Sequence, residues 1–537
     1  MNILMIASEC KKIAKIGGLA DVVYDLSNSL VKKENSVKII IPYYDIISIK
    51  ADFIKKMEIE FGTKKFSIDI YKENLNGIEL YLVKSKEFFS GKNGTIYINS
   101  PPDRPFEDDA KRFGFFCKCV AEIVKNSKEF QKIDVVHCHD WHSSLFLLLL
   151  KCDPEYSKLS KKLRSLFTIH NLDYQGIRPF ELKNDNEFRS FSSWFPDLYD
   201  RLKEKKNILN LIVDPKSSDF CINLMRTGIN LSDFVNTVSP TYANEIIKKD
   251  DIERSFFGGR GLEEDLGRIF YKEKRLAGIL NGIDYNEIDS KKGKFPYDID
   301  IAEWHKIRYE YKKYIIENLE KEIEKIAFKN KRNILKKVKS INKRDWIEKP
   351  LFISITRVVS QKLGILFEKV TDRFVYEEIL KKNLNYIIIG NGELEDNLQS
   401  LNKYPNFIFI NAFAPELAND LYKCADFFLM PSDFEPCGIS QLIALRYGTL
   451  PIVHDIGGLH DTVKNMDTGF SYYGTNRLAT KYSLIQTIEK IIFYYNNEKE
   501  FLYFMQQNAM KERFSWDNSV EKYMNIYQKI SGTGLIC

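Results

Sequence analysis

Short apolar runs alternate with longer amphipathic stretches along the first half of the chain. Helix-length stretches such as Asp109–Asn126 and Pro240–Lys249 separate many of these runs. Continuous apolar strands that alternate with helices predict a parallel sheet covered on both faces. The runs that predict strands are Ile3–Ala7, Val37–Pro42, Ile78–Val83, Ile133–Cys138, Leu166–Ile169, Phe234–Val238 and Gly278–Ile283.

The same alternation restarts at Leu351 and predicts a second, shorter α/β unit. Its helices include Glu416–Cys424 and Ile439–Tyr447. Ligands in such open sheets bind beyond the carboxyl ends of the strands, so the residues after each run are candidates for function. The predicted strands are Leu351–Thr356, Tyr386–Ile389, Phe407–Ile410, Phe427–Met430 and Pro451–Val453.

The segment between the two units, Ser290–Lys349, is dense in Lys and Glu and poor in apolar runs. Within it, Lys306–Lys339 predicts a long charged helix or helix pair, and we expect a solvated linker and surface helix. After Tyr482 the chain is again helical, with aromatic residues at helical spacing, which favours packing over ligand contact. These aromatic residues are Phe501, Phe504, Trp516, Tyr523 and Tyr527.

Composition narrows the class of protein. The chain has 537 residues, 44% hydrophobic and 29% charged, which is ordinary for a globular enzyme of two or more domains. The net charge of +6 is spread along the chain and is too weak to indicate a nucleic-acid partner. Nine scattered cysteines without a C-x-x-C indicate reduced thiols. No basic leader precedes the first apolar run, and Leu145–Leu150 is too short to cross a bilayer, so we expect a cytoplasmic protein without membrane partners.

One phrase occurs near both ends of the chain. Ile16–Val23 reads IGGLADVV and Ile456–Val463 reads IGGLHDTV, each after an apolar run and at a predicted helix start. A glycine turn at a helix start presents bare N–H groups to an anion. Lys15 directly precedes the first copy and would suit a diphosphate. Two such units indicate two nucleotide-binding halves across a cleft, and ordinary strand–helix turns are the alternative.

Three histidines lie at the end of the fourth predicted strand and directly after it, as His137, His139 and His142, with Asp140 and Trp141 among them. A metallohydrolase would need an acidic residue directly before the last histidine, where Trp141 stands instead. Zinc sites require a matching ligand set. We therefore favour a polar contact between one histidine and substrate over a metal site.

The next predicted strand is followed by His170, Asn171, Asp173, Tyr174 and Gly176. Polar and aromatic residues at a strand end suit the hydroxyls and ring faces of a sugar. The alternative is a loop in which Asn171 and Asp173 cap the backbone.

The second unit carries cations and a carboxylate at strand ends. Arg357 follows a predicted strand, and Lys362 stands five residues on, so the two could clamp a diphosphate. Glu435 precedes Pro-Cys-Gly at a helix start. A carboxylate there could hold sugar hydroxyls or stabilise positive charge at an anomeric carbon. The alternative is an N-terminal capping carboxylate.

Taken together, these phrases closely resemble the family of bacterial glycogen synthases and plant starch synthases, which are retaining GT-B glycosyltransferases. They occur in family order over almost the whole chain. The matching phrases are KIGGLADVV (15–23), DVVHCHDWH (134–142), TIHNLDYQG (168–176), TVSPTYANEI (237–246), GILNGID (278–284), GNGELE (390–395), FEPCGISQLIALRYGTLPIV (434–453), GGLHDTV (457–463) and FSW (514–516).

The resemblance implies an α/β protein of the GT-B class, with two Rossmann-like domains facing across a central cleft. We expect an N-terminal acceptor-side domain over 1–283 and a charged linker with a helical insertion over 284–348. A nucleotide-sugar-binding domain would span 349–496, and C-terminal helices 497–532, the last of which crosses back to the first domain.

The implied activity is transfer of glucose from ADP-glucose to the non-reducing 4-OH end of an α-1,4-glucan, glycogen or a maltooligosaccharide. Transfer would retain the anomeric configuration by a front-face mechanism that needs no enzymic nucleophile. No cofactor and no metal are expected. The rivals are a related GT-B enzyme that uses UDP-glucose or another acceptor, a non-catalytic glucan-binding relative, and a metallohydrolase built on the three histidines.

The family's functional residues map onto matching positions of this chain. By resemblance, the donor phosphate would contact Lys15, Gly17 and Gly18, and the leaving diphosphate would contact Arg357 and Lys362. The transferred glucose would contact Asp108, His139 and Glu435, and the donor would also contact Gly438, Ile439 and Ser440. The candidates for other sugar or acceptor contacts are Asp21, His170, Asn171 and Tyr174.

Four positions depart from the family pattern. Leu363 replaces a glycine after the clamp lysine, and Asp433 replaces an arginine before Phe-Glu-Pro-Cys-Gly. Arg226 replaces a lysine, and Ile456 replaces a threonine before the second glycine pair. The charge reversal at Asp433 bears most directly on efficiency and donor choice. Intact Lys15, Arg357, Lys362 and Glu435 favour an active enzyme.

Overall fold

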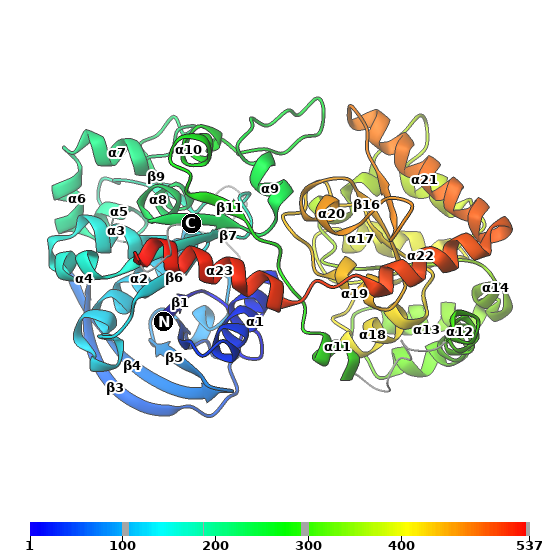
Figure 1. Ribbon diagram of the computed structural model, residues 1–537, viewed down its shortest axis with the longest axis horizontal. Helices are drawn as coiled ribbons and strands as arrows, with labels where there is room; N and C mark the ends of the chain where they lie inside the picture. Colours follow the sequence, from blue (N-terminus) through cyan, green and yellow to red (C-terminus); the bar gives the residue numbers. More distant parts are fainter. Residues whose placement is uncertain (99–106, 186, 291–299, 533–537) are drawn as a thin grey trace. The chain divides into compact units, whose positions relative to one another are not determined.

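The computed structural model describes residues 1–98, 107–185, 187–290 and 300–532. Within these residues the chain forms two compact units, each with its own sheet and core (Figure 1). Unit 1 contains Met1–Asp250, Gly258–Gly282 and the chain from Trp516 onward, and unit 2 contains Asp251–Phe257 and Ile283–Ser515. Two α/β units with Rossmann-like sheets confirm the predicted fold class.

Unit 1 is organised on a nine-stranded sheet of order β11-β10-β7-β6-β1-β2-β5-β4-β3. Neighbours from β11 through β5 pair in parallel, and β5-β4-β3 continue antiparallel. Its strands are β1 (Asn2–Ile6), β2 (Ser36–Pro42), β3 (Asp52–Phe61), β4 (Lys64–Leu75), β5 (Ile78–Lys84), β6 (Val135–His139), β7 (Arg164–Ile169), β10 (Phe234–Thr237) and β11 (Leu276–Gly278), with a separate antiparallel pair β8 (Ile177–Pro179) and β9 (Cys221–Asn223).

Helices cover this sheet because its central strands are apolar on both faces. The C-terminal helix α23, drawn in red in Figure 1, belongs to unit 1 and packs against α1 and β7. The helices of unit 1 are α1 (Gly18–Lys32), α2 (Glu107–Asn126), α3 (Ser144–Cys152), α4 (Ser157–Lys162), α5 (Phe191–Trp194), α6 (Pro196–Leu202), α7 (Lys206–Ile212), α8 (Leu224–Leu231), α9 (Pro240–Glu245), α10 (Glu263–Gly267) and α23 (Trp516–Ser531).

Unit 2 is organised on a six-stranded, wholly parallel sheet of order β14-β13-β12-β15-β16-β17. Its strands are β12 (Leu351–Ile355), β13 (Asn385–Ile389), β14 (Phe407–Ile410), β15 (Phe427–Met430), β16 (Leu450–His454) and β17 (Phe470–Tyr472). Its helices are α11 (Tyr285–Ser290), α12 (Ile301–Glu324), α13 (Lys331–Ser340), α14 (Lys343–Glu348), α15 (Ser360–Leu363), α16 (Val375–Leu380), α17 (Glu395–Ser400), α18 (Pro415–Cys424), α19 (Ser440–Arg446), α20 (Gly457–Thr462), α21 (Arg477–Asn497) and α22 (Lys499–Lys511).

The charged segment before β12 is helical, as predicted, and α12 is a surface helix with an exposed face, but it is not a linker, because its other face belongs to the core of unit 2. Asp300 caps this helix by accepting from the N–H of Ala302 at 2.8 Å. One face of α12 is buried in the core of unit 2 through Trp304, Ile316 and Leu319, and the helix packs against α18. Lys and Glu occupy the opposite face. Because these residues dominate the composition of the segment, its apolar stripe is not evident from composition alone.

The antiparallel strands at the edge of unit 1 had no counterpart in the predicted elements. β3 exposes most of its side chains, including Lys55 and Lys56, so it lacks the continuous apolar run that marked the parallel strands. The strand predicted over Gly278–Ile283 is also wrong, because β11 ends at Gly278. The aromatic stripe packs as expected at Tyr523 and Tyr527, whereas Phe504 is exposed. No helix within the described residues is long and apolar enough to cross a membrane.

Candidate active site

Each sheet has a point at which its strand order reverses, and open α/β sheets bind ligands in the crevice beyond the carboxyl ends of those strands. In unit 1 this switch lies between β1 and β6, since β2 and β5 continue to one side and β7, β10 and β11 to the other. In unit 2 it lies between β12 and β15. The first glycine turn, the His137–His142 phrase, the Arg357–Lys362 segment and Glu435 lie at the ends of these four strands, so each unit gathers these candidates at its own switch point. The His170–Gly176 phrase and the second glycine pair follow the neighbouring strands β7 and β16.

The glycine turn of unit 1 contacts a carboxylate of its own chain. The N–H groups of Ile16 and Gly17 both donate to Glu9 Oε2, at 2.6 and 3.0 Å. The other carboxylate oxygen, Oε1, accepts from the hydroxyl of Tyr97 at 2.6 Å. The turn therefore presents N–H groups to an anion, as predicted. The anion in this structure is the carboxylate of Glu9, which accepts from two of these N–H groups. Glu9 was not a candidate, although it follows β1 closely at the carboxyl end.

Lys15 and Asp21, both predicted as site residues, contact each other. The Lys15 ammonium lies 2.6 Å from Asp21 Oδ1, beside the first turn of α1, which begins at Gly18. The Lys15 side chain is 46% exposed, whereas that of Asp21 is 13% exposed. Asp21 thus orients a cation that remains open to solvent beside the glycine turn.

His139 and His170 are brought together from two neighbouring strands, with His139 Nδ1 3.0 Å from His170 Nε2. Burial lowers the pKa of His139 well below its usual value and that of His170 to about 3, so both rings are neutral at pH 7. His139 Nε2 is buried and has no hydrogen-bond partner within the described chain. A buried imidazole nitrogen without a partner is rare and indicates a ligand or water contact.

Asp140 supports this pair through the backbone. It has a positive φ of 54° and accepts from the backbone N–H of His170 at 2.7 Å. Burial raises the pKa of Asp140 to about 8. Of the other predicted sugar contacts in this loop, Asn171 accepts from the N–H of Asp173 at 3.0 Å, as the capping alternative predicts, and Tyr174 is exposed.

Of the other two histidines of the His-Cys-His-Asp-Trp-His phrase, His137 is part of the core, whereas His142 is buried with an Nδ1 that has no hydrogen-bond partner within the described residues. His137 contacts Tyr527 Oη at 2.8 Å and Thr168 Oγ1 at 2.6 Å, so both of its ring nitrogens are engaged. Thr168 donates to Asn236, which donates to the Tyr523 hydroxyl at 3.0 Å, and the network fastens α23 to the sheet. The described residues contain no group of three His, Cys, Asp or Glu side chains placed to hold a metal ion, so the three histidines do not form the ligand set that a metallohydrolase requires.

Asp108 lies at the start of α2 with a 56% exposed side chain, 3.9 Å from the Lys111 ammonium. The buried carboxylate is its neighbour Asp109, which accepts from Arg112 Nη1 at 2.6 Å. Burial raises the pKa of Asp109 to about 6 despite this arginine. Asp109 and Arg112 are both buried, and Arg112 also donates to the carbonyls of Phe88 and Ile96, so this pair fixes the segment before α2. Asp108, in contrast, is exposed to solvent.

In unit 2, the switch point brings Lys362 and Glu435 together. Lys362 Nζ forms an ion pair with Glu435 Oε2, and both side chains are nearly buried, at 12% and 8% exposure. Ser432 Oγ donates to the same carboxylate oxygen at 3.3 Å. Arg357, which follows β12, is exposed and has no hydrogen-bond or ion-pair partner among the residues that the structure describes. Two cations thus lie at this strand edge, one paired and one open.

The loop that carries Glu435 is fixed on both sides. Gln361 Nε2 donates to the Phe434 carbonyl at 2.9 Å, and the Asp433 N–H donates to the Gln361 carbonyl at 2.8 Å. The Gly458 N–H donates to the Glu435 carbonyl at 3.0 Å. A Cβ at Gly458 would lie 2.3 Å from Cys437 Cα, so the second glycine pair permits close approach of two backbones. Packing, rather than an open anion site, accounts for that phrase.

Around the predicted donor-contact positions, Gly438 adopts a φ of 78°, and a Cβ there would lie 2.4 Å from Gln441 Oε1. Ile439 is the N-cap residue of α19, and Ser440 begins the helix and hydrogen-bonds the Tyr422 hydroxyl. The Gly438 backbone conformation strongly favours glycine.

The departure at Asp433 has a partner. Arg477, the first residue of α21, donates through Nη1 to Asp433 and through Nε to Glu368 at 2.9 Å. Burial raises the pKa of Asp433 and outweighs the opposing effect of Arg477. A guanidinium therefore lies beside the loop although the family's arginine at this position is absent.

Comparison with known proteins shows the family of this chain. A family model described as the starch synthase catalytic domain matches residues 2–268, and one for group 1 glycosyl transferases matches 331–498. The chain is 32% identical over 546 residues to a glycogen synthase of Alkaliphilus metalliredigens, covering 99% of this chain and 100% of the relative. The chain belongs to the glycogen and starch synthase family. A glycogen synthase of Bacillus cereus is likewise 32% identical, over 99% of this chain and 100% of the relative.

Solved structures extend the agreement to three dimensions. The catalytic domain of starch synthase IV from Arabidopsis thaliana, bound to ADP and acarbose, superposes with a TM-score of 0.77 at 25% identity over 99% of both chains. A sucrose-phosphate synthase from Thermosynechococcus elongatus shares the fold with a TM-score of 0.54, at 13% identity over 99% of this chain and 100% of the other. As a member of the glycogen and starch synthase family, the chain is a GT-B glycosyltransferase, as the sequence phrases predicted.

Proposed function

We propose that this enzyme transfers glucose from ADP-glucose to the non-reducing 4-OH end of an α-1,4-glucan, with retention at the anomeric carbon. The names of its full-length relatives support glycogen synthesis. The Arabidopsis starch synthase IV domain binds ADP and acarbose, a combination that supports an adenine nucleotide and an oligosaccharide as substrates here.

The observation that carries the proposal is the buried Lys362–Glu435 ion pair beside the open Arg357 at the switch point of unit 2. When the bond between glucose C1 and the phosphate oxygen breaks, negative charge develops on the departing diphosphate. Preorganised cations stabilise such charge most strongly where water is excluded. We assign Lys362 and Arg357 to this role, with Glu435 holding the ammonium in place and the sugar hydroxyls within reach.

In unit 1 we assign a hydrogen-bonding role to His139 and donor-phosphate contacts to Lys15, Gly17 and Gly18. The lowered pKa of His139 keeps the ring neutral, so it binds a sugar hydroxyl through Nε2 and does not act as a general acid near pH 7. Lys15 is exposed and oriented by Asp21, which suits a cation that receives a phosphate.

Group transfer then needs no enzymic nucleophile. A bond forms between glucose C1 and the acceptor O4 on the face from which the diphosphate departs, and the acceptor proton passes to a departing phosphate oxygen. The two cations supply the charge that a divalent metal supplies in other transferases, so we propose that no metal is required.

A product analysis tests this proposal. The protein is incubated with ADP-glucose labelled with ¹³C at the anomeric carbon and with maltotetraose, and the product is examined by NMR. The expected product is maltopentaose with a labelled α-1,4 linkage at its non-reducing end. A labelled β linkage contradicts retention, and binding of maltotetraose without any transfer supports the non-catalytic relative instead.

A further inference from the structure

Unit 2 contains a second polar pocket at the opposite edge of its sheet. Asp426 and Phe427 line this pocket and stand at the amino end of β15, whereas Ser432 and Glu435 follow the carboxyl end of the same strand. Since the strands of this sheet are parallel, the two ends of β15 lie at different edges. The pocket is therefore separate from the candidate active site.

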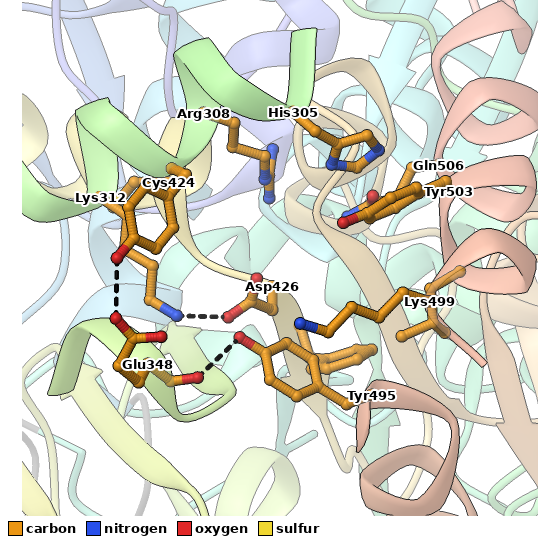
Figure 2. Close-up of a pocket in the computed structure, with 13 residues that line it drawn as sticks. His305, Arg308, Lys312, Glu348, Cys424, Asp426, Tyr495, Lys499, Tyr503 and Gln506 are labelled. Atoms are coloured by element: carbon orange, nitrogen blue, oxygen red, sulfur yellow. Dashed lines mark hydrogen bonds and ion pairs between the residues drawn. The ribbon is translucent and has the colours of Figure 1, made fainter. Parts of the chain in front are cut away.

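The helix α12, which precedes β12 in the charged segment, forms one wall of this pocket, and α22 forms the facing wall (Figure 2). The space it encloses is about 130 Å³, well above what one ordered water needs. The residues that the argument uses are His305, Arg308 and Lys312 from α12 and Lys499, Tyr503 and Gln506 from α22.

The pocket has an excess of positive charge. Arg308 is 4% exposed, and its Nη atoms donate only to uncharged acceptors, including the Tyr447 carbonyl at 2.6 Å and Thr449 Oγ1 at 2.8 Å. Its Nε is buried without a partner within the described residues. Lys312 is neutralised by Asp426 at 2.7 Å. Asp426 also acts on Arg308 through space, and Glu348 is the other carboxylate that lines the pocket. Three lining cations therefore face two carboxylates, and an anion in the pocket would offset the remaining positive charge.

Lys499 adds a second available cation. Figure 2 shows its side chain reaching from α22 toward the interior of the pocket. Its ammonium forms no hydrogen bond or ion pair within the described part of the chain, and lies 5.9 Å from the ring centroid of Tyr495. Arg308 and Lys499 thus offer donors from the two facing walls.

Neutral polar atoms in the same pocket also lack partners among the described residues. Gln506 is 5% exposed, and its Oε1 is buried without a hydrogen bond. His305 Nε2 is likewise buried and unpartnered, while its ring stacks on Tyr503 with centroids 3.4 Å apart. Burial lowers the pKa of His305 to about 3, so this ring is neutral at pH 7. Hydroxyl groups can satisfy an acceptor and an imidazole nitrogen at once.

We propose that this pocket binds a small phosphate ester that carries hydroxyl groups, with the phosphate on Arg308 and Lys499 and the hydroxyls on Gln506 and His305. The ring or carbon chain of such a ligand would lie along Tyr503. A neutral sugar would leave the excess positive charge of the pocket without an anion. Binding would join α12 to α22 and stabilise unit 2.

Binding measurements on the full chain test this proposal. Calorimetry and thermal melting are run with glucose 6-phosphate, glycerol 3-phosphate, inorganic phosphate and glucose. We expect both esters to bind and raise the melting temperature, inorganic phosphate to bind more weakly, and glucose not to bind. Equal binding of glucose, or no binding of either ester at about 1 mM, the upper end of typical physiological substrate levels, overturns the proposal.

Variants locate the bound ester. Lys499→Ala should weaken glucose 6-phosphate binding by about tenfold, as loss of one hydrogen bond to a charged group predicts. Lys511→Ala, at the exposed end of the same helix, is the matched control and should bind normally. Lys362→Ala, in the candidate active site, should also bind normally. An unchanged affinity in Lys499→Ala, or a loss confined to Lys362→Ala, places the ester elsewhere and overturns the assignment.

Discussion

Lys362 and Glu435 form an ion pair that joins the segment after β12 to the loop after β15. The two side chains are 12% and 8% exposed, and Ser432 donates to the same carboxylate oxygen. Because both groups are largely removed from water, each fixes the position of the other and compensates its charge. This pair lies where the strand order of the sheet reverses, and it is the centre of the proposed chemistry.

Replacing the cation should affect the chemical step more than binding. Lys362→Ala removes one contact to the departing diphosphate, and turnover should fall by about a hundredfold, or about 3 kcal/mol. Affinity for maltooligosaccharide should change little. Steady-state kinetics and acceptor binding measure the two effects, with Lys381→Ala, an exposed member of an ion pair on the same unit, as control. Near-normal turnover of Lys362→Ala would remove this lysine from the mechanism.

Replacing the carboxylate tests whether Glu435 acts in the transition state or only holds the loop. Glu435→Gln keeps the shape and removes the charge, and turnover should fall by roughly a hundredfold while donor affinity changes little. Single-turnover rates and melting temperatures on one preparation separate the two roles.

The double variant sharpens this test. If Lys362 and Glu435 act as a unit, Lys362→Ala with Glu435→Gln should be little slower than either alone, because coupled residues are not additive. Multiplication of the two effects would show that they act independently, and a stable Glu435→Gln with a normal chemical rate would refute the role in transfer.

The buried histidines predict loss of stability in mild acid. Burial lowers the pKa of His142 to about 3, whereas an unfolded histidine titrates near 6.5. The unfolded chain therefore binds the proton first, and stability falls as pH decreases from about 6.5 toward 3 by about 1.4 kcal/mol per pH unit for each such group. Asp140 acts in the opposite sense between about pH 8 and 4, because burial raises its pKa to about 8.

The contribution of one histidine can be isolated by comparing urea unfolding of the wild type with that of His142→Leu at pH 7, 6 and 5. His142→Leu should gain stability relative to the wild type as the pH falls, because Leu does not bind a proton in the unfolded chain. A constant difference between the two proteins across this range would mean that His142 is protonated equally in both states.

The pair of Asp433 and Arg477 predicts a rescue by charge exchange. Asp433→Arg, which restores the residue typical of the family, would bring two guanidinium groups together and should lower the melting temperature. Exchange of both residues, as Asp433→Arg with Arg477→Asp, should recover part of the loss, because the introduced guanidinium then faces a carboxylate again, while the pair between Arg477 and Glu368 is lost. Equal instability of the single and double variants would show that this ion pair does not fix the loop.

The sequence predicted most parallel strands because they are apolar on both faces, as β1, β6 and β12 are. It did not predict the edge strands β3 and β4, whose side chains are largely solvated. Likewise α12 was expected to be mainly solvated, since its buried stripe is diluted by Lys and Glu.

Within the candidate site, Lys362 and Glu435 stood out because each follows a strand within a specific phrase. Glu9 did not, since a single carboxylate near a glycine turn carries no distinctive spacing, although it binds two N–H groups of that turn. The pocket between α12 and α22 could not be foreseen, because His305 and Gln506 are about two hundred residues apart, on the order of a whole domain, and meet only through packing.

The most direct test of the account is a donor panel with a maltooligosaccharide acceptor. Initial rates are measured with ADP-glucose, UDP-glucose and GDP-glucose, each with and without EDTA, on one preparation whose metal content is known. The account predicts the highest kcat/KM with ADP-glucose, an unchanged rate in EDTA and no stoichiometric zinc. A clear preference for UDP-glucose would contradict the proposed donor, and loss of activity in EDTA that a divalent ion restores would contradict the metal-free mechanism.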